Sequence, residues 1–121
     1  MYEIIIEESF SSAHKLRDYQ GVCENLHGHN WKVVIVLESE HLNEQGIVVD
    51  FKDAKKITEE LMDKLDHKYL NELSWFRSIN PTTENISEFL FNELNAKMPD
   101  NVYVKKVTTW ESDGFGASYY K

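Results

Sequence analysis

Two stretches with apolar residues at helical spacing stand next to each other in the middle of this 121-residue chain, and short β-branched runs flank them on both sides. The first stretch, residues 51–65, follows Asp50, whose side chain can cap a helix. The second begins at Thr82 or Thr83 and is stopped by Pro99, which cannot continue a helix. We therefore predict two consecutive amphipathic helices.

Strand patterns precede and follow the helices. Residues 2–10 and 33–37 are rich in β-branched side chains and predict one antiparallel pair. Residues 102–111 and 117–120 predict a second pair, joined by the turn signal at residues 112–114. The order β-β-α-α-β-β predicts an α+β fold, in which two helices cover one face of a four-stranded antiparallel sheet.

A histidine pair, His27-Gly28-His29, lies just ahead of the second β-branched run. Residues i and i+2 of a strand point to the same face, so both imidazoles can reach one metal ion. His14, at the end of the antiparallel partner strand, is the candidate third ligand. Imidazole without a soft thioether favours zinc over copper, and three protein ligands leave a position open for water or substrate. Unrelated, solvent-facing histidines are the simpler alternative.

The single cysteine, Cys23, lies four residues before His27 and next to Glu24. A thiolate near zinc can act as a base or a nucleophile, because a neighbouring cation lowers the thiol pKa. As a fourth ligand, Cys23 would instead close the site into a structural zinc centre. The sequence leaves both interpretations open.

Asp66, His67 and Glu111 are further candidates. Asp66 can orient and charge His67 for general acid/base catalysis, whereas a histidine favoured by a helix C-terminus is the simpler reading. Glu111, beside Trp110 at a strand end, can accept two N–H donors from a flat heterocycle, or it can simply face water.

Composition narrows the choice of function. The net charge of −8, from 13 Lys and Arg against 21 Asp and Glu, argues against nucleic acid as a partner. No apolar run approaches the ~20 residues needed to span a membrane, and the N-terminus does not resemble a signal peptide. One cysteine cannot form an internal disulfide, so we expect a reduced, cytoplasmic setting. The length fits one domain over residues 1–121.

Six segments together resemble the 6-pyruvoyl-tetrahydropterin synthase / 6-carboxy-5,6,7,8-tetrahydropterin synthase family over nearly the whole chain. The segments are Phe10–His14, Cys23–His29, Val49–Phe51, Leu65–Asn71, Asn80–Asn85 and Trp110–Glu111. The resemblance implies a T-fold whose subunits assemble into a barrel, with a homo-hexamer favoured and active sites between subunits. It also implies a role for each candidate residue. His14, His27 and His29 would bind zinc, and Cys23 would be the catalytic base. Asp66 and His67 would form its acid/base relay, and Glu111 would anchor the pterin ring.

The implied substrate is 7,8-dihydroneopterin triphosphate. The short chain and the gap between Cys23 and His27 resemble the branch that makes 6-carboxy-5,6,7,8-tetrahydropterin with loss of acetaldehyde, toward 7-deazaguanine and queuosine. Glu24 departs from that pattern. Relatives with a glutamate in this loop resemble aldolases that release 6-hydroxymethyl-7,8-dihydropterin for folate, so Glu24 acting on the substrate gives an alternative or second activity. A non-catalytic zinc-stabilised module is the alternative from another class.

A triphosphate substrate requires cationic side chains despite the negative net charge. Lys15, Arg17 and Lys52 are the candidates for this role.

Overall fold

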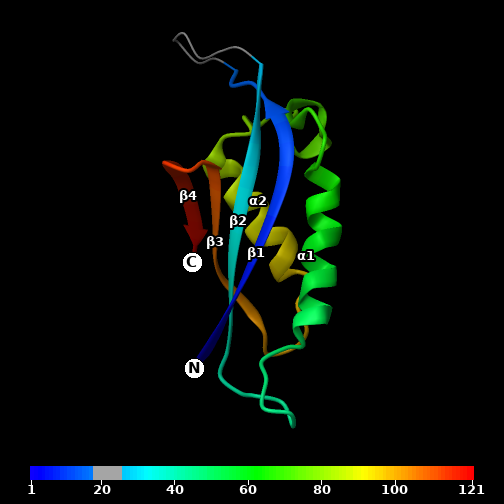
Figure 1. Ribbon diagram of the computed structural model, residues 1–121, viewed down its shortest axis with the longest axis vertical. Helices are drawn as coiled ribbons and strands as arrows, with labels where there is room; N and C mark the ends of the chain where they lie inside the picture. Colours follow the sequence, from blue (N-terminus) through cyan, green and yellow to red (C-terminus); the bar gives the residue numbers. More distant parts are fainter. Residues whose placement is uncertain (18–25) are drawn as a thin grey trace.

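The computed structural model describes residues 1–17 and 26–121, so Cys23 and Glu24 lie outside the described residues. The strands are β1 (Tyr2–His14), β2 (His27–Ser39), β3 (Tyr103–Ser112) and β4 (Phe115–Tyr120). They form one antiparallel sheet in the order β1-β2-β3-β4 (Figure 1). The predicted arrangement of strands is confirmed, and Asp113 and Gly114 make the predicted tight turn between β3 and β4.

The helices pack on one face of this sheet. The helix α1 (Phe51–Leu65) contacts β1, and α2 (Thr83–Asn95) contacts β3 and β4 (Figure 1). Both caps act as predicted, since the Asp50 side chain accepts the Lys52 N–H at 2.8 Å and the Thr82 hydroxyl accepts the Asn85 N–H at 3.0 Å.

The end of α2 differs from the prediction. The helix ends at Asn95 and not directly at Pro99. A proline inside a helix clashes with the carbonyl four residues earlier, here that of Asn95, so the turn has to open before Pro99 is reached. The Asn95 side chain then accepts the Val104 N–H at 3.0 Å and ties the helix end to β3.

The segments before and after α1 join no strand of the sheet. Residues 47–49, whose β-branched side chains favour an extended backbone, instead bend into α1. The connection between the helices contains two single-turn 3₁₀ helices, Leu70–Glu72 and Ser74–Phe76.

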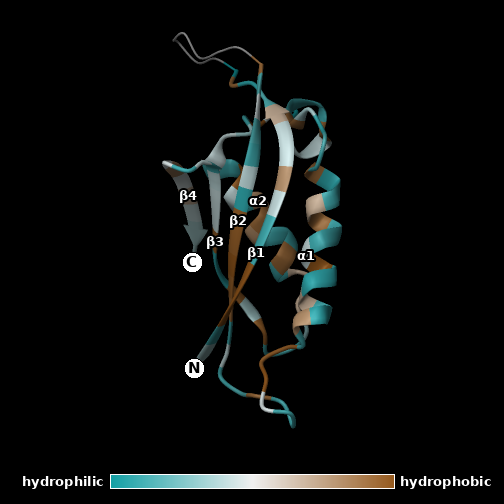
Figure 2. Ribbon diagram, viewed as in Figure 1, coloured by the Kyte–Doolittle hydropathy of each residue, from teal (hydrophilic) through white to brown (hydrophobic). Residues whose placement is uncertain are grey.

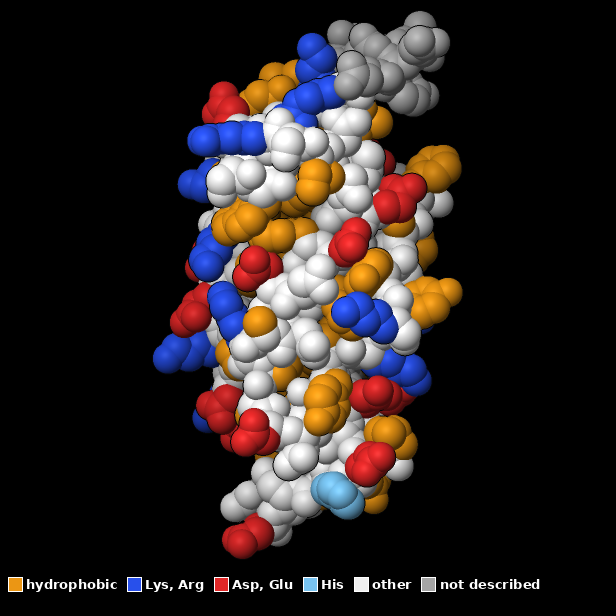
Figure 3. Space-filling view, turned by 180° about the vertical axis from the view of Figure 1, so that it is seen from behind, with side chains coloured by type: hydrophobic (Ala, Val, Ile, Leu, Met, Phe, Trp, Pro, Cys, Tyr) orange, Lys and Arg blue, Asp and Glu red, His pale blue; other side chains and the backbone are white. Residues whose placement is uncertain are grey.

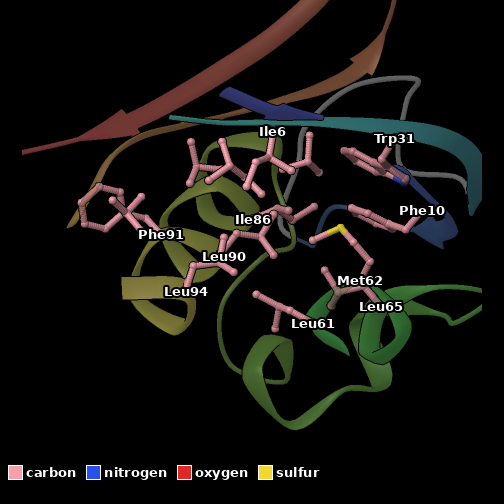
Figure 4. Close-up of a cluster of buried hydrophobic side chains, with 14 of the residues drawn as sticks. Ile6, Phe10, Trp31, Leu61, Met62, Leu65, Ile86, Leu90, Phe91 and Leu94 are labelled. Atoms are coloured by element: carbon pink, nitrogen blue, oxygen red, sulfur yellow. The ribbon is translucent and has the colours of Figure 1, made fainter. Parts of the chain in front are cut away.

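The core lies between the sheet and the helices. Along β1 the even-numbered side chains Ile6 and Phe10 are buried, whereas the odd-numbered Ile5 is 64% exposed on the opposite face. The Phe10 and Trp31 rings stack with centroids 5.7 Å apart. Brown apolar segments in Figure 2 follow the inner sides of the helices, and Figure 4 shows their side chains meeting those of the strands. Burying such a side chain typically contributes about 1.5–3 kcal/mol.

Charged side chains cover the outer surface. The face in Figure 3 mixes basic and acidic side chains. Among the described residues, neither helix has the length and apolar character that crossing a bilayer requires.

Candidate metal centre and acid/base pair

Three strands bring four potential metal ligands to the same end of the sheet. The register of β1 and β2 pairs His14 with His27 and Ser12 with His29. Side chains at paired positions share a face, so the three histidines lie together on the helix-covered side of the sheet. Glu111 reaches them from β3. The predicted convergence of His14 with the histidine pair is thus observed.

The ligand atoms are spaced as a zinc ion requires. His14 Nε2 lies 2.9 Å from His27 Nε2 and 3.2 Å from Glu111 Oε1. Glu111 Oε1 lies 3.5 Å from His27 Nε2 and 2.8 Å from His29 Nε2. Four ligands about 2.0–2.1 Å from a tetrahedral zinc ion are separated by roughly 3.3 Å, and the observed distances bracket this value. The residues present therefore fit zinc.

His14 is the most buried histidine of the cluster, and a hydrogen bond holds its ring in place. Its side chain is 3% exposed, against 25% for His29 and 36% for His27. His14 Nδ1 lies 2.8 Å from the carbonyl oxygen of Pro81. Because a carbonyl only accepts, Nδ1 carries the hydrogen, and Nε2 of the neutral ring then presents its lone pair to the cluster.

His29 contributes a buried nitrogen that hydrogen bonding does not satisfy. Its Nε2 is close to Glu111 Oε1, but it has no hydrogen bond of acceptable geometry among residues 1–17 and 26–121. Burial lowers the pKa of His29. The carboxylate of Glu111 opposes this shift, and the neighbouring imidazoles of His27 and His14 add to it. The neutral imidazole that results is the form that binds a metal ion.

Trp31 forms the apolar wall of the cluster. Its fully buried ring meets the His14 ring edge-on at 4.9 Å and the His29 ring at 5.4 Å. The indole N–H donates to the Ser12 carbonyl at 3.1 Å, which fixes the ring in turn. Trp31 was not among the site residues predicted from the sequence.

Glu111 completes the cluster from β3. Burial raises the pKa of its carboxyl, but His29 and His14 outweigh this effect and hold the pKa below its ordinary value. Its second oxygen, Oε2, accepts a long hydrogen bond of 3.4 Å from the Thr83 hydroxyl. The carboxylate is therefore ionised and held between the histidines and the start of α2.

Asp66 and His67 form the expected ion pair, but on the outer edge of β1, on the side away from β2. Asp66 Oδ1 accepts the Ser11 N–H at 2.7 Å, and Asp66 Oδ2 lies 2.9 Å from His67 Nδ1. The hydrogen bond from Ser11 lowers the pKa of Asp66, with burial opposing and His67 adding to the effect. His67 has φ 54° and a side chain that is 83% exposed. The structure thus groups the three histidines with Glu111, and Asp66 separately with His67.

The cations expected to bind phosphate lie in different places. The Arg17 guanidinium donates to the carbonyls of Asn71 and Ile79 at 3.0 and 3.3 Å and so braces the fold. Lys52 lies in the first turn of α1, at the opposite end of that helix from Asp66. Lys15, which is exposed, directly follows His14. Within one subunit, Lys15 is therefore the best placed of the three.

Comparison with known proteins agrees with this geometry. The family model for 6-pyruvoyl tetrahydropterin synthase matches residues 3–121. The chain is 34% identical to a dihydroneopterin monophosphate aldolase from Pyrococcus furiosus, over 93% of this chain and 92% of that protein. It is 37% identical to a putative 6-carboxy-5,6,7,8-tetrahydropterin synthase from Archaeoglobus fulgidus, over 89% and 86% of the two chains.

The solved structure of Caenorhabditis elegans 6-pyruvoyl tetrahydropterin synthase superposes with a TM-score of 0.86 at 28% identity, covering 100% of this chain and 97% of that one. A Plasmodium falciparum 6-pyruvoyl tetrahydropterin synthase gives a TM-score of 0.78 at 22% identity, covering 99% and 97%. The expected T-fold is confirmed. The chain belongs to the 6-pyruvoyl tetrahydropterin synthase family.

Proposed function

We propose that this chain is a zinc-dependent carbon–carbon lyase of the cytoplasm. It converts 7,8-dihydroneopterin triphosphate to 6-carboxy-5,6,7,8-tetrahydropterin, releasing acetaldehyde and triphosphate, on the route to 7-deazaguanine and queuosine. The observation that carries the proposal is the convergence of three imidazole nitrogens and one carboxylate oxygen within 4.8 Å of one another. Kinship to relatives named 6-carboxy-5,6,7,8-tetrahydropterin synthase supports this choice of product.

In this proposal His14, His27 and His29 hold the zinc ion. A bound zinc ion supplies a Lewis acid that polarises a substrate oxygen. The Pro81 carbonyl keeps the His14 ring in the tautomer that binds metal, and the buried Trp31 ring keeps bulk water away from the inner side. His27 and His29, which are more exposed, lie toward the open side where the substrate enters.

Glu111 anchors the pterin ring. An ionised carboxylate can accept two parallel N–H bonds from the flat heterocycle, and the depressed pKa keeps Glu111 in this form. Its place next to the histidines would bring the ring's side chain close to the metal ligands. The alternative role for the same carboxylate is that of a fourth zinc ligand. Substitution of Glu111 distinguishes the two roles, because it weakens zinc binding only if Glu111 is a ligand.

Cys23 and the Asp66–His67 pair move the protons. Asp66, held ionised, orients His67 through Nδ1, which leaves His67 Nε2 to give or take a proton. The exposed position of His67 on the outer edge of β1 suits a site completed by a neighbouring subunit. We therefore include a homo-oligomer, with a hexamer favoured and active sites between subunits, in the proposal.

A second candidate function is cleavage of a dihydroneopterin phosphate to 6-hydroxymethyl-7,8-dihydropterin, with Glu24 acting on the substrate. The 34% identity to the Pyrococcus furiosus aldolase supports it. Both reactions use the same pterin, so the identity of the released product distinguishes them.

The Cys23→Ala variant separates the lyase from a zinc-stabilised module without activity. The lyase proposal expects the variant to retain zinc and stability and to lose turnover. If Cys23 closes a structural site, the variant loses zinc and stability together. Zinc content by atomic emission, thermal unfolding and turnover of 7,8-dihydroneopterin triphosphate are measured on the same preparation, with His41→Ala, at an exposed histidine outside the cluster, as the control.

A further inference from the structure

The outer edge of β1 is closed by the chain that connects α1 to α2. The backbone groups of Ser11 and Ala13 point away from β2 on this edge. His67 donates its N–H to the Ser11 carbonyl at 2.6 Å, and Ala13 donates to the Lys68 carbonyl at 3.0 Å. The connection thus replaces a neighbouring strand along the last residues of β1.

Two asparagine side chains continue this edge beyond the end of the strand. Asn71 accepts the Lys15 N–H at 2.9 Å and donates to the Lys15 carbonyl at 2.7 Å. Asn80 does the same for Arg17, with both distances 2.8 Å. Each carboxamide satisfies both backbone groups of one residue, as a paired strand would. The backbone of Lys15 and of Arg17 is therefore held in place although neither residue belongs to a strand.

The same contacts connect this segment to the support of His14. Asn80 directly precedes Pro81, whose carbonyl takes the hydrogen bond from His14 Nδ1. The Asn80 carbonyl itself accepts from the Asn85 side chain at 2.9 Å, which fixes it to the first turn of α2. Asn80 therefore ties the chain that leaves His14 to the carbonyl that orients the His14 ring.

Asn71 provides the second attachment point. Its side chain is nearly buried, and its backbone carbonyl accepts the Arg17 guanidinium at 3.0 Å. Asn71 thus holds Lys15, and Asn80 holds Arg17. Both held residues lie just after His14 in the chain. Movement of this segment would displace His14 along β1.

We propose that Asn71 and Asn80 are positioning residues for the metal centre: they hold the backbone of residues 15–17 so that the His14 imidazole stays against the Pro81 carbonyl. This inference rests on the proposed function, because it takes His14 to be a zinc ligand. Loss of a residue that orients a metal ligand commonly lowers metal affinity by about 10–100-fold, and we expect this range for Asn71→Ala and for Asn80→Ala.

The matched control is Asn43→Ala. Asn43 Oδ1 also accepts two backbone N–H groups, from Gln45 at 2.9 Å and Ile47 at 3.2 Å. Asn43 lies in the connection between β2 and α1, at the opposite end of the molecule from His14 (Figure 1). The control therefore removes a comparable number of side-chain hydrogen bonds without touching the support of the metal centre.

Zinc affinity is measured by competition with a chromophoric chelator, and the visible spectrum of the Co²⁺-loaded protein reports ligand geometry. We expect both variants to bind zinc about 10–100-fold more weakly and to shift the Co²⁺ bands, with Asn43→Ala unchanged. Unchanged affinity and spectrum in both variants, or an equal change in Asn43→Ala, would overturn the inference.

Two further results separate the possible failures. Wild-type protein that binds no zinc would overturn the proposed metal centre and this inference with it, whereas wild-type binding beside unaffected variants would overturn the inference alone. If an alanine variant does not fold, Asn71→Asp and Asn80→Asp keep the acceptor for the backbone N–H, lose the donor to the backbone carbonyl and add a negative charge. Weaker zinc binding by these folded variants supports the inference, and unchanged binding overturns it.

Discussion

His14 donates from Nδ1 to the carbonyl oxygen of Pro81 across 2.8 Å, which joins the end of β1 to the residue two positions before α2. This hydrogen bond spans 67 positions in the sequence. It fixes the tautomer of the most buried histidine of the cluster. In the proposed metal centre, the inner histidine is thereby oriented before any metal binds.

The three clustered histidines should each be required for zinc. Replacing His14, His27 or His29 by alanine removes one ligand, and we expect zinc affinity to fall by more than about 100-fold, beyond the range seen for supporting residues. His41→Ala should bind zinc as the wild type does, since its side chain is 80% exposed away from the cluster. Retention of zinc by any of the three cluster variants would remove that histidine from the ligand set.

Glu111→Gln tests whether this carboxylate anchors the pterin or binds zinc. The amide keeps the size of the side chain but removes the charge that pairs with the N–H donors of the heterocycle. We expect zinc content to stay at the wild-type level and kcat/KM to fall at least about 10-fold, equivalent to roughly 1.4 kcal/mol. Loss of zinc from this variant would instead assign Glu111 to the ligands.

Asp66 should make stability depend on pH in the acid range. Its pKa is lower in the folded protein than in an unfolded chain, so its ionised form stabilises the fold above about pH 4, and this contribution disappears as the pH falls through the folded-state pKa. Asp66→Asn should therefore be less stable than the wild type at pH 7, with the difference shrinking toward pH 3. Urea unfolding at both pH values measures it.

Asp63→Asn is the matched control for this comparison, because Asp63 is an exposed aspartate near the end of α1, three residues before Asp66. A difference between the wild type and Asp66→Asn that stays constant from pH 7 to pH 3 would show that the charge of Asp66 does not stabilise the fold.

Gly116 should not tolerate a side chain. A Cβ atom at this position would lie 2.7 Å from two ring carbons of Trp110, so Gly116→Ala has to displace the indole. We expect a loss of about 1–3 kcal/mol in the free energy of unfolding. Gly114→Ala, where a Cβ meets no atom within 4 Å, should change stability by less than about 0.5 kcal/mol. Equal effects of the two substitutions on the urea midpoint would contradict the close packing of Trp110 on Gly116.

The sequence predicts the parts of this site that lie close together along the chain. His14 and His27 meet because they end and begin two strands of one hairpin, and period-two alternation then places His29 on the same face. Adjacent residues likewise predict the ion pair of Asp66 with His67. Strand and helix patterns are strong here because the β-branched runs and the two apolar stripes have different periods.

Contacts between distant segments could not be predicted in this way. Glu111 faces the histidines only because β3 pairs with β2, and spacing along the chain contains no information about that pairing. The same holds for the Pro81 carbonyl and for Asn71 and Asn80, although all three lie in segments that the family resemblance marks. The location of His67 on the outer edge of β1 depends on how the connection after α1 folds back, which no local pattern specifies.

The most direct test of the central claim is product analysis by mass spectrometry, with the zinc-loaded protein incubated with 7,8-dihydroneopterin triphosphate. We expect 6-carboxy-5,6,7,8-tetrahydropterin together with acetaldehyde, and no product from the metal-free protein. Release of 6-hydroxymethyl-7,8-dihydropterin would assign the chain to the aldolase reaction. Unchanged substrate in the presence of bound zinc would contradict the lyase function altogether.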